Sequence, residues 1–426
     1  MAIEIEDKLN VFWNNEKVGT LYRIFRKNKI RLLFSYSDTW EGNPISLSLP
    51  IPNERNELIL ATNFFKFLLF EESQKEIICG RLGINETDNF TLLKNFGKDC
   101  AGALQILPDG IYPETERTVL RDVTSKVEDH IKSEAIYRDN KILTPNLFLD
   151  CKARLSLAGN QDKLPCVYKD GKVYVPDQGM TTHILKTPSR RFQNLPENEY
   201  ICMKLAKKIG FDVPDCDLIK IADKWCYLVE RYDRKNNQRL HQEDFAQALG
   251  LDKKYQDENG PSIKSCMSVI DKYNLSDNDK EKFIKFVIFN YCIGNTDAHG
   301  RNYSILIPKH GQAKLAPLYD SICSLVYPLD RKVAMSIGNT FVIDKIREVS
   351  WQGFCKDVDI SVKEFDEYRT EIVDKINQEL FGVIADLVNK KTHNEDPACA
   401  IGHTIMNFTN KLEKIDFNLE ASPSFS

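Results

Sequence analysis

Apolar positions in the second half of the chain recur with helical spacing. Three long stretches repeat about every 3.6 residues, which predicts helices with a buried face: Asp279–Ile293, Val362–Lys391 and Pro397–Ile415. A further helix is expected to begin at Pro196, with acidic residues near its positive end, and to stop at Gly210. The C-terminal part is therefore predicted to be mostly α-helical.

The first half has shorter runs with the alternation typical of strands. Leu9–Ser48 reads as strands with a turn at Asn14–Lys17, and Leu58–Cys79 has the periodicity of an amphipathic helix. The β-branched and apolar runs Thr181–Lys186 and Trp225–Val229 predict two further strands. These patterns indicate a β-rich N-terminal half.

The domain organisation follows from composition. A chain of 426 residues, 42% of them hydrophobic, is long enough for two or three domains with buried cores. A polar, charged stretch of weak periodicity between Pro113 and Pro145 indicates a boundary. We predict an N-terminal β-rich module at 1–112, a small lobe at 113–235 and a helical large lobe at 236–426.

The stretch Gly294–Asn302 carries the main chemical signal. It places Asp297 and Asn302 five residues apart, directly after an apolar run. In phosphoryl transfer, an Asp aligns and deprotonates the attacking hydroxyl, and an Asn five residues later holds a magnesium ion against the phosphates. This spacing is typical of a kinase catalytic loop, although such a pair alone also occurs by chance.

The residues after Asn302 strengthen the kinase interpretation. Tyr303–Asp320 reads as a β-hairpin with a turn at Pro308–Gly311, and it delivers a second acid. Asp320 is therefore predicted to be the second magnesium ligand. Ser321 follows it, where a protein kinase would have phenylalanine.

A kinase also needs a lysine on a strand to hold the phosphates of ATP, and Lys186 suits this role. Its usual partner is a glutamate on a helix, and Glu199 is a better candidate than Glu197. Alternatively, both acids only complement the helix dipole.

A short polar turn at residues 154–163 precedes this lysine and has a single glycine, Gly159. Its position suits a phosphate-binding loop, but in isolation it would be only a hairpin.

Together these segments resemble the HipA family of serine/threonine kinases, the toxins of bacterial HipA/HipB toxin–antitoxin pairs. The resemblance is strong over about residues 150–340 and rests on these blocks: SLAGNQDK (156–163), THILKTP (182–188), ENEYICMKLAKKIG (197–210), LVERYDR (228–234), LHQEDFAQALG (240–250), GNTDAHGRNYS (294–304) and LAPLYDS (315–321). It implies an α+β, bilobal protein-kinase-like fold with a small β-rich N-terminal module, a mixed small lobe and a mostly α-helical large lobe.

The resemblance also implies roles for individual residues. Asp297 would be the catalytic base, with magnesium on Asn302 and Asp320. ATP would contact Lys186 and the turn before it, at Ser156, Ala158, Gly159, Gln161 and Lys163. Glu230 and Tyr232 are placed at the adenine hinge by position alone. Gln242 could line the nucleotide pocket or simply precede a helix. His299 could donate to a phosphate oxygen or staple its own loop.

Ser156 matches the serine that these kinases autophosphorylate, an event implied to expel the loop and switch off the enzyme. A dianionic group beside bound triphosphate would repel it. Without the family, a lone serine between leucines would be a buried strand residue. The sequence departs from the common loop at Asn160, which replaces a small residue, and at Asp162, which replaces a glutamate.

The expected partners follow from family and charge. The resemblance implies a helix-turn-helix, HipB-like antitoxin and a protein substrate, such as an aminoacyl-tRNA synthetase, glutamyl-tRNA synthetase among them. A net charge of −4 argues against unaided DNA binding. The alternatives are a catalytically silent corepressor, which would usually have lost one of the key residues, and a small-molecule phosphotransferase.

Twelve cysteines without a C-x-x-C pair argue against a zinc site and suggest reduced core residues, as at Cys202, Cys226 and Cys292. The charged N-terminus and the short apolar runs predict a cytoplasmic protein with no membrane segment.

Overall fold

The computed structural model describes residues 5–26, 29–55, 57–113, 118–133, 136–138, 141–143, 146–151, 163–189, 191–391 and 396–417. The chain forms two compact units. The first consists of Met1–Pro196, Asp215–Glu243 and Leu306–Gly311. The second consists of Glu197–Pro214, Asp244–Ile305 and Gln312–Ser426.

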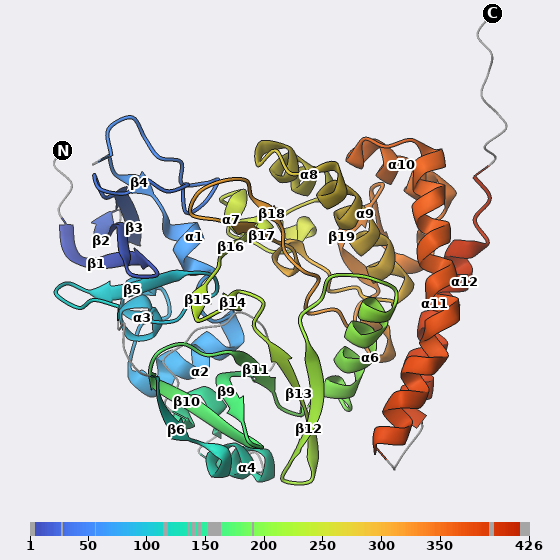
Figure 1. The fold of residues 1–426 in the computed structure, drawn as a ribbon, viewed down its shortest axis with the longest axis horizontal. Helices are drawn as coiled ribbons and strands as arrows, with labels where there is room; N and C mark the ends of the chain where they lie inside the picture. The colour runs from blue at the N-terminus through green and yellow to red at the C-terminus, as the bar shows by residue number, and fades with distance from the viewer. Residues whose placement is uncertain are drawn as a thin grey trace, which may run out of the picture. The chain divides into compact units, whose positions relative to one another are not determined.

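A five-stranded antiparallel sheet begins the first unit, with β1–β4 in blue and β5 in cyan in Figure 1. Its strands, in the order β4-β3-β2-β1-β5, are β1 (Ile5–Trp13), β2 (Glu16–Arg26), β3 (Lys29–Tyr36), β4 (Ile59–Leu60) and β5 (Leu104–Pro108). Asn14 has φ +53° in the β1–β2 turn, a conformation that asparagine adopts more readily than most residues. The predicted turn and the strands up to Tyr36 are confirmed, but the predicted strand region extended to Ser48, and residues 37–48 form turns and bends instead.

The predicted single helix over Leu58–Cys79 is wrong. The segment holds β4 and two helices, α1 (Thr62–Lys66) and α2 (Glu72–Leu82), and Phe67–Phe70 between the helices is buried throughout. The ring of Phe70 packs edge-on against Phe148, with centroids 4.7 Å apart. Burial of this apolar run in an aromatic cluster overrides the local helical periodicity.

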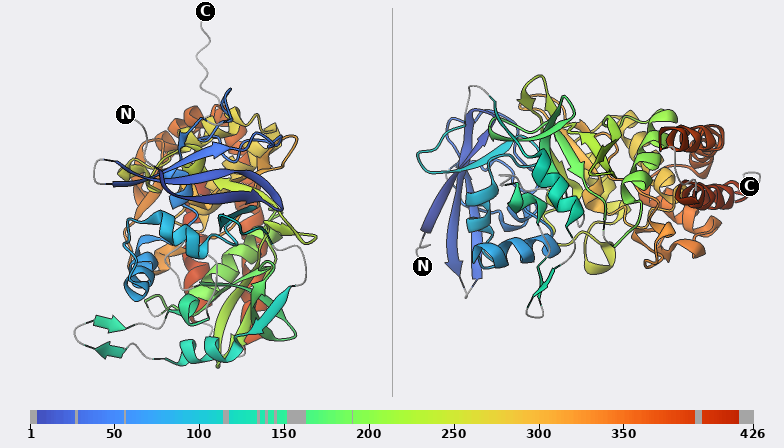
Figure 2. Two further views of the ribbon diagram at one scale, coloured as in Figure 1. Left: turned by 90° about the vertical axis from the view of Figure 1, so that its left-hand side faces the viewer. Right: turned by 90° about the horizontal axis from the view of Figure 1, so that it is seen from below.

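The first unit also contains a six-stranded antiparallel sheet. Its order is β12-β13-β11-β9-β10-β6, with β6 (Val119–Asp122), β9 (Lys163–Lys169), β10 (Lys172–Gln178), β11 (His183–Lys186), β12 (Cys216–Ile221) and β13 (Lys224–Glu230). The two strands predicted from the β-branched runs are β11 and β13. The unit also contains α3 (Asn89–Phe96), α4 (Thr124–Lys132), α5 (Leu147–Asp150), β14 (Arg234–Lys235), β15 (Gln238–Arg239) and the β7–β8 hairpin (Ile136–Arg138, Lys141–Leu143). Figure 2 shows that hairpin projecting from the rest of its unit.

The second unit is mostly helical, as predicted for the C-terminal part. Its helices are α6 (Leu195–Lys208, whose first two residues belong to the first unit), α7 (Phe245–Ala248), α8 (Ile263–Lys272), α9 (Asp277–Cys292), α10 (Glu348–Val358), α11 (Val362–Lys391) and α12 (Asp396–Glu413). The remaining elements of this unit are β18 (Lys314–Leu315), β19 (Lys332–Ile337), β20 (Thr340–Val342) and the short 3₁₀ helices η1 (Gln256–Glu258), η2 (Gly300–Asn302), η3 (Ser324–Val326) and η4 (Ile343–Lys345). Two strands are divided between the units: all of β16 (His241–Asp244) except Asp244 belongs to the first, and β17 (Ser304–Ile307) has its first two residues in the second.

The four predicted helices correspond to α6, α9, α11 and α12. α6 ends as expected, because Gly210 adopts φ +100° and the amide of Phe211 donates to the Ala206 carbonyl at 3.0 Å. α11 and α12 run side by side in Figures 1 and 2. An aromatic core around Trp351 includes Tyr291 of α9 and Phe365 of α11, at 5.2 and 5.0 Å between ring centroids. Packing of this kind provides most of the stability of such helices.

The twelve cysteines all lie within the described residues, and none forms a disulfide. All are buried except Cys399. Burial raises the pKa of the Cys100 and Cys292 thiols to about 12, so these thiols stay neutral and pack as small apolar groups. Across the described part of the chain, no helix combines the length and apolarity needed to cross a bilayer.

Candidate active site

The loop that carries Asp297 begins where α9 ends, and the buried side-chain amide of Asn290 holds the start of this loop. Asn290, on the last turn of α9, is 4% exposed. Its Nδ2 donates to the Phe286 carbonyl at 2.9 Å and to the hydroxyl of Tyr303 at 3.2 Å, and its Oδ1 accepts from Nδ2 of Asn295 at 2.8 Å. Because buried amides need partners, this network fixes how the chain leaves the helix.

A second set of bonds holds the loop beside Asp297. The amide of Thr296 donates to Oγ of Ser324 at 2.7 Å, and its carbonyl accepts from the amide of Ala334 at 2.9 Å. The amide of Asp297 donates to Oδ1 of Asn295 at 3.0 Å. The backbone leading into the candidate base is thus tied to Asn295 and to the segments of Ser324 and Ala334.

The carboxylate of Asp297 is half-buried and accepts a hydrogen bond from another segment. The hydroxyl of Tyr255 donates to its Oδ1 at 2.7 Å. His299 is 6% exposed, and its ring packs edge-on against Tyr255 with centroids 5.4 Å apart. This packing is consistent with the loop-stapling alternative for His299.

The hairpin after the loop brings the second acid to Asn302. The amide of Ala316 donates to the Ser304 carbonyl at 2.9 Å, which joins the two arms. Nδ2 of Asn302 lies 3.2 Å from Oδ2 of Asp320. Asp320 has φ +56°, a left-handed conformation that costs energy for most residues, is tolerated by Asp, and is often found at functional sites.

This donor set fits a magnesium ion. Magnesium binds hard oxygen ligands, in kinases from one or two carboxylates together with substrate phosphates. Asp320 offers a carboxylate. Asn302 turns its Nδ2 toward that carboxylate, while its Oδ1 accepts from the amide of His299 at 3.3 Å, so a rotation of the Asn302 side chain would bring its oxygen to the metal. Among the described residues, no group of three or more His, Cys, Asp or Glu side chains could hold a metal ion. In kinases the other ligands of such a metal come from the phosphates of the nucleotide and from water.

The candidate phosphate lysines occupy neighbouring strands of the six-stranded sheet. Lys186 on β11 pairs directly with Lys163 on β9 and with Tyr227 on β13. Lys186 is 6% exposed, and its ammonium lies 5.8 Å from the centroid of the Tyr227 ring. Directly opposed residues point to the same face of an antiparallel pair, where like charges are unfavourable. Two opposed lysines are thus suited to an anion.

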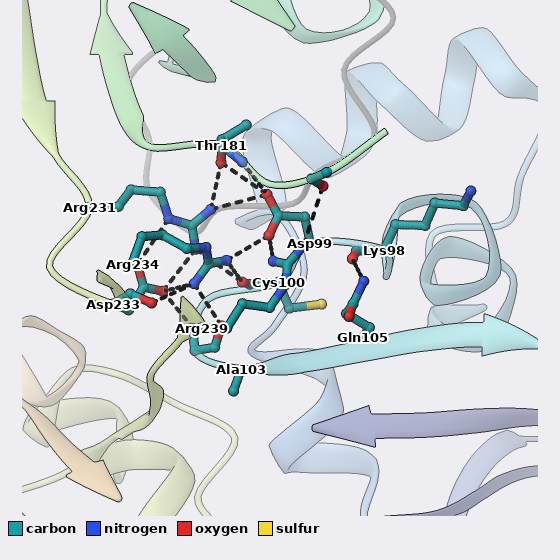
Figure 3. A network of polar contacts seen from close by, with 12 residues as sticks. Lys98, Asp99, Cys100, Ala103, Gln105, Thr181, Arg231, Asp233, Arg234 and Arg239 are labelled. Atoms are coloured by element: carbon teal, nitrogen blue, oxygen red, sulfur yellow. Dashed lines mark hydrogen bonds and ion pairs between the residues drawn. The ribbon is translucent and has the colours of Figure 1, made fainter. Parts of the chain in front are cut away.

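The predicted hinge is fixed by a buried network of charges in the first unit, shown in Figure 3. Arg231 donates from Nε and Nη2 to the two oxygens of Asp233, at 3.0 and 2.8 Å. Arg234 donates to Oδ1 of Asp99 at 2.6 Å, and Arg239 forms an ion pair with the same oxygen. Oδ2 of Asp99 accepts from the amide of Thr181 at 3.1 Å.

Burial and charge shift the pKa values of this network in opposite directions. Burial acts to raise the pKa of Asp233, but Arg231 and Arg234 outweigh it and lower that pKa to about 2. Burial lowers the pKa of Arg234 to about 9 and that of Arg239 to about 10. Asp233, Arg234 and Arg239 therefore remain charged at neutral pH. The network as a whole joins three guanidinium groups to two carboxyl groups.

Between these charged residues, the predicted hinge side chain Tyr232 is half-buried, and its hydroxyl is hydrogen-bonded to Oε1 of Gln242. Glu230 is exposed at the end of β13, and its amide donates to the Asp215 carbonyl at 2.8 Å. Its backbone donor is thus already used within the protein, so an adenine contact would need another hinge group.

The predicted site residues divide between the two units. Lys163, Lys186, Glu230, Tyr232 and Gln242 belong to the first. Asp297, His299, Asn302, Asp320 and the buried Glu199 belong to the second. Ser156, Ala158, Gly159 and Gln161 lie outside the described residues. The roles of all these residues stay predictions.

Sequence reasoning missed several residues that support the loop. Asn290 could have been noticed as a lone amide in an apolar helical run. Asn198 on α6 is a second buried amide. Its Nδ2 donates to the Cys323 carbonyl at 2.9 Å and its Oδ1 accepts from the Cys323 amide at 2.8 Å, which ties α6 to the segment after Asp320. Tyr255 gave no signal, because it lies 42 residues before Asp297.

Two family models match the chain. The HipA N-terminal domain matches residues 9–107, and the HipA-like C-terminal domain matches residues 155–380. The chain belongs to the HipA family. The resemblance drawn from the sequence blocks is thus confirmed.

Individual relatives cover most of the chain. A putative kinase, Y4mE, from Sinorhizobium fredii is 35% identical over 400 residues, 89% of this chain and 92% of the relative. The serine/threonine-protein kinase toxin HipA of Shewanella oneidensis is 28% identical over 86% of this chain and 87% of its own length. A structure of HipA with HipB and operator DNA from Shewanella oneidensis matches with a TM-score of 0.78 and 25% identity, covering 96% of this chain and 97% of that one.

These matches confirm the predicted kinase-like fold of mixed strands and helices and the enzyme class. As a HipA-family member, the chain is a protein kinase. Its kinase relatives imply the use of a nucleotide and a metal ion in general.

Proposed function

We propose that this HipA-family chain is an ATP- and magnesium-dependent serine/threonine kinase that acts as a growth-arresting toxin. The observation that carries the proposal is the approach of Asn302 to Asp320, at 3.2 Å, in the same unit as Asp297. An acid, an amide and a second acid in this order are what phosphoryl transfer requires. The catalytic effect would come from positioning and charge neutralisation.

Each residue then has a defined task. Lys186, opposed by Lys163, binds the phosphates, and magnesium on Asn302 and Asp320 neutralises their charge. Asp297 aligns the hydroxyl of a protein substrate and accepts its proton. The buried Glu199 is the proposed ion-pair partner of Lys186, and the segment around Glu230 and Tyr232 is the proposed adenine hinge.

The proposed substrate is an aminoacyl-tRNA synthetase, such as glutamyl-tRNA synthetase, whose phosphorylation would stop translation. We also propose self-limitation by autophosphorylation at Ser156. The support for both is the family membership and the match of residues 156–163 to the family's loop. Phosphopeptide mapping after incubation with labelled ATP tests Ser156, and the same labelling in cell lysate tests the substrate.

We further propose a HipB-like antitoxin as the protein partner. The support is the similarity to a HipA chain whose structure contains HipB and operator DNA. The net charge of −4 does not favour contact with the DNA backbone by this chain alone. DNA contact would therefore be made through the antitoxin.

The decisive test of catalysis is Asp297→Asn, which keeps the shape of the side chain but removes the base. We expect phosphate transfer from ATP to fall at least roughly 100-fold, because a positioned acid–base group contributes about 10²–10⁴-fold. Nucleotide affinity and thermal stability should be kept. The assay is transfer of label from ATP to protein with magnesium.

Asp271→Asn is the matched control, because Asp271 is exposed on α8. It should transfer at the wild-type rate. Full transfer by Asp297→Asn would refute the assignment of the base. Absence of transfer in the wild type would favour the silent-corepressor alternative.

A further inference from the structure

Tyr255 is positioned by its own segment to meet Asp297. The residue comes directly before η1, and its carbonyl accepts from the amides of Glu258 and Gly260 at 3.1 and 2.7 Å, which closes a tight turn. Its neighbour Gln256 is tied to β19, because its Oε1 accepts from the amide of Ser336 at 2.7 Å. The backbone at Tyr255 is therefore held in place by hydrogen bonds within the turn and to β19.

The same segment braces the loop at two further points. The Tyr255 ring packs edge-on against the buried His299. Pro261 lies so close to Gly300 that a Cβ on Gly300 would be 2.3 Å from Cγ of the proline. Only glycine fits there without displacement. Residues 255–261 thus contact the loop at Asp297, His299 and Gly300.

We infer that Tyr255 is a positioning residue for phosphoryl transfer, which it serves by orienting the carboxylate of the base. A carboxylate rotates about its last bond, and its two oxygens both accept hydrogen bonds. The Tyr255 hydroxyl holds Oδ1 at 2.7 Å, which fixes the carboxylate plane and leaves Oδ2 to accept from the substrate hydroxyl.

This inference rests on the proposed role of Asp297. The hydrogen bond from Tyr255 would act by pre-orientation. A carboxylate already held in the reactive geometry avoids the entropy cost of reaching that geometry in each turnover. Tyr255 does not touch the nucleotide in this scheme. Its loss should therefore lower the rate of transfer and leave ATP binding unchanged.

The test is Tyr255→Phe, which removes the hydroxyl and keeps the ring against His299. We expect the rate constant for label transfer from saturating Mg-ATP to protein to fall roughly tenfold, the loss of one hydrogen bond to a charged group. The half-saturating ATP concentration and the melting temperature should stay at wild-type values. This split separates positioning from a structural role, which would change all three.

Tyr368→Phe is the matched control. Tyr368 also donates from its hydroxyl to a carboxylate, Oε1 of Glu364 at 3.1 Å, but both residues lie on α11. Deleting this hydroxyl removes the same kind of bond and should leave the transfer rate unchanged.

The double variant Tyr255→Phe/Asp297→Asn decides whether the tyrosine acts through the base. If it does, the double variant transfers at the residual rate of Asp297→Asn alone. A wild-type rate in Tyr255→Phe would overturn the inference while an inactive Asp297→Asn upheld the base. A faster Tyr255→Phe would also overturn it, since the tyrosine would then compete with the substrate hydroxyl. An active Asp297→Asn would instead refute the proposed function.

Discussion

His241 illustrates how one buried residue makes stability depend on pH. Its Nε2 lies 2.8 Å from the Ile45 carbonyl and therefore donates, and its Nδ1 accepts from the amide of Ala103 at 3.4 Å. The ring packs against Trp13, with centroids 4.4 Å apart. If Nδ1 also carried a proton, that proton would point at the N–H group of Ala103 and the hydrogen bond would be lost. Burial and this geometry keep the ring neutral, with its pKa lowered to about 4.

The neutral ring stabilises the folded state only at higher pH. The unfolded residue has a pKa of about 6.5, so the unfolded chain binds the proton first as pH falls. We expect on the order of 3 kcal/mol of stability to be lost between about pH 6.5 and 4. In His241→Gln this part of the pH dependence should be missing. Urea unfolding at pH 7 and at pH 4.5 measures the difference.

The exposed His403 provides the comparison. His403→Gln should show the same loss of stability on acidification as the wild type. If His241→Gln lost as much stability as His403→Gln over this range, the neutral buried histidine would not be the cause.

At the scale of elements, the structure depends on polar residues that join segments far apart in the sequence. Asp99 precedes β5, its partner Thr181 precedes β11, and its partner Arg234 is the first residue of β14. A buried ion pair adds little net stability, but loss of one partner leaves an uncompensated charge. The charge network holds the turn between β13 and β14, which contains the proposed hinge.

Asp99→Ala should therefore be strongly destabilising. It would leave three buried guanidinium groups with one carboxylate, and we expect a loss of about 3–5 kcal/mol in the free energy of unfolding. The measurement is the urea midpoint. Asp109→Ala is the control, because Asp109 pairs with Lys8 at 2.9 Å in an exposed bridge. The Asp109→Ala variant should have a urea midpoint close to that of the wild type. Equal midpoints for the two variants would contradict the importance of the buried network.

At the scale of the whole molecule, the compact units are not continuous segments of sequence. The second unit includes Glu197–Pro214, which contains nearly all of α6. Asn198 on this helix bonds to Cys323 and to the hydroxyl of Tyr327, at 2.9 and 3.2 Å through Nδ2. A helix from the middle of the chain is therefore part of the C-terminal core.

A fragment of residues 236–426 should consequently fold poorly. Without α6 the fragment exposes the apolar surface that this helix covers. The polar groups that bond to Asn198 would also lose this hydrogen-bond partner. We expect weak protection from proteolysis and dye binding to exposed apolar surface. A fragment of residues 197–426 should be better protected. Equal protection of both fragments would show that α6 is dispensable for this unit.

Part of this molecule could be predicted from local sequence. The helices α9, α11 and α12 and the strands β11 and β13 have strong periodicity, and such patterns report which face is buried. The order of Lys186, Asp297, Asn302 and Asp320 predicted kinase chemistry, because phosphoryl transfer fixes the types and order of these groups. The blocks around them predicted the family, which the comparisons confirm.

Tertiary structure decided what local patterns could not. The run from Phe67 to Phe70 leaves its helical period because an aromatic cluster buries it. The hydroxyl of Tyr255 bonds to Asp297, which lies 42 residues later in the sequence, and Asp99 meets its arginines only when separate strands assemble. Contacts between distant segments depend on the path of the whole chain. The sequence by itself therefore determined the family and the candidate reacting groups, and the tertiary structure decided which residues lie against those groups.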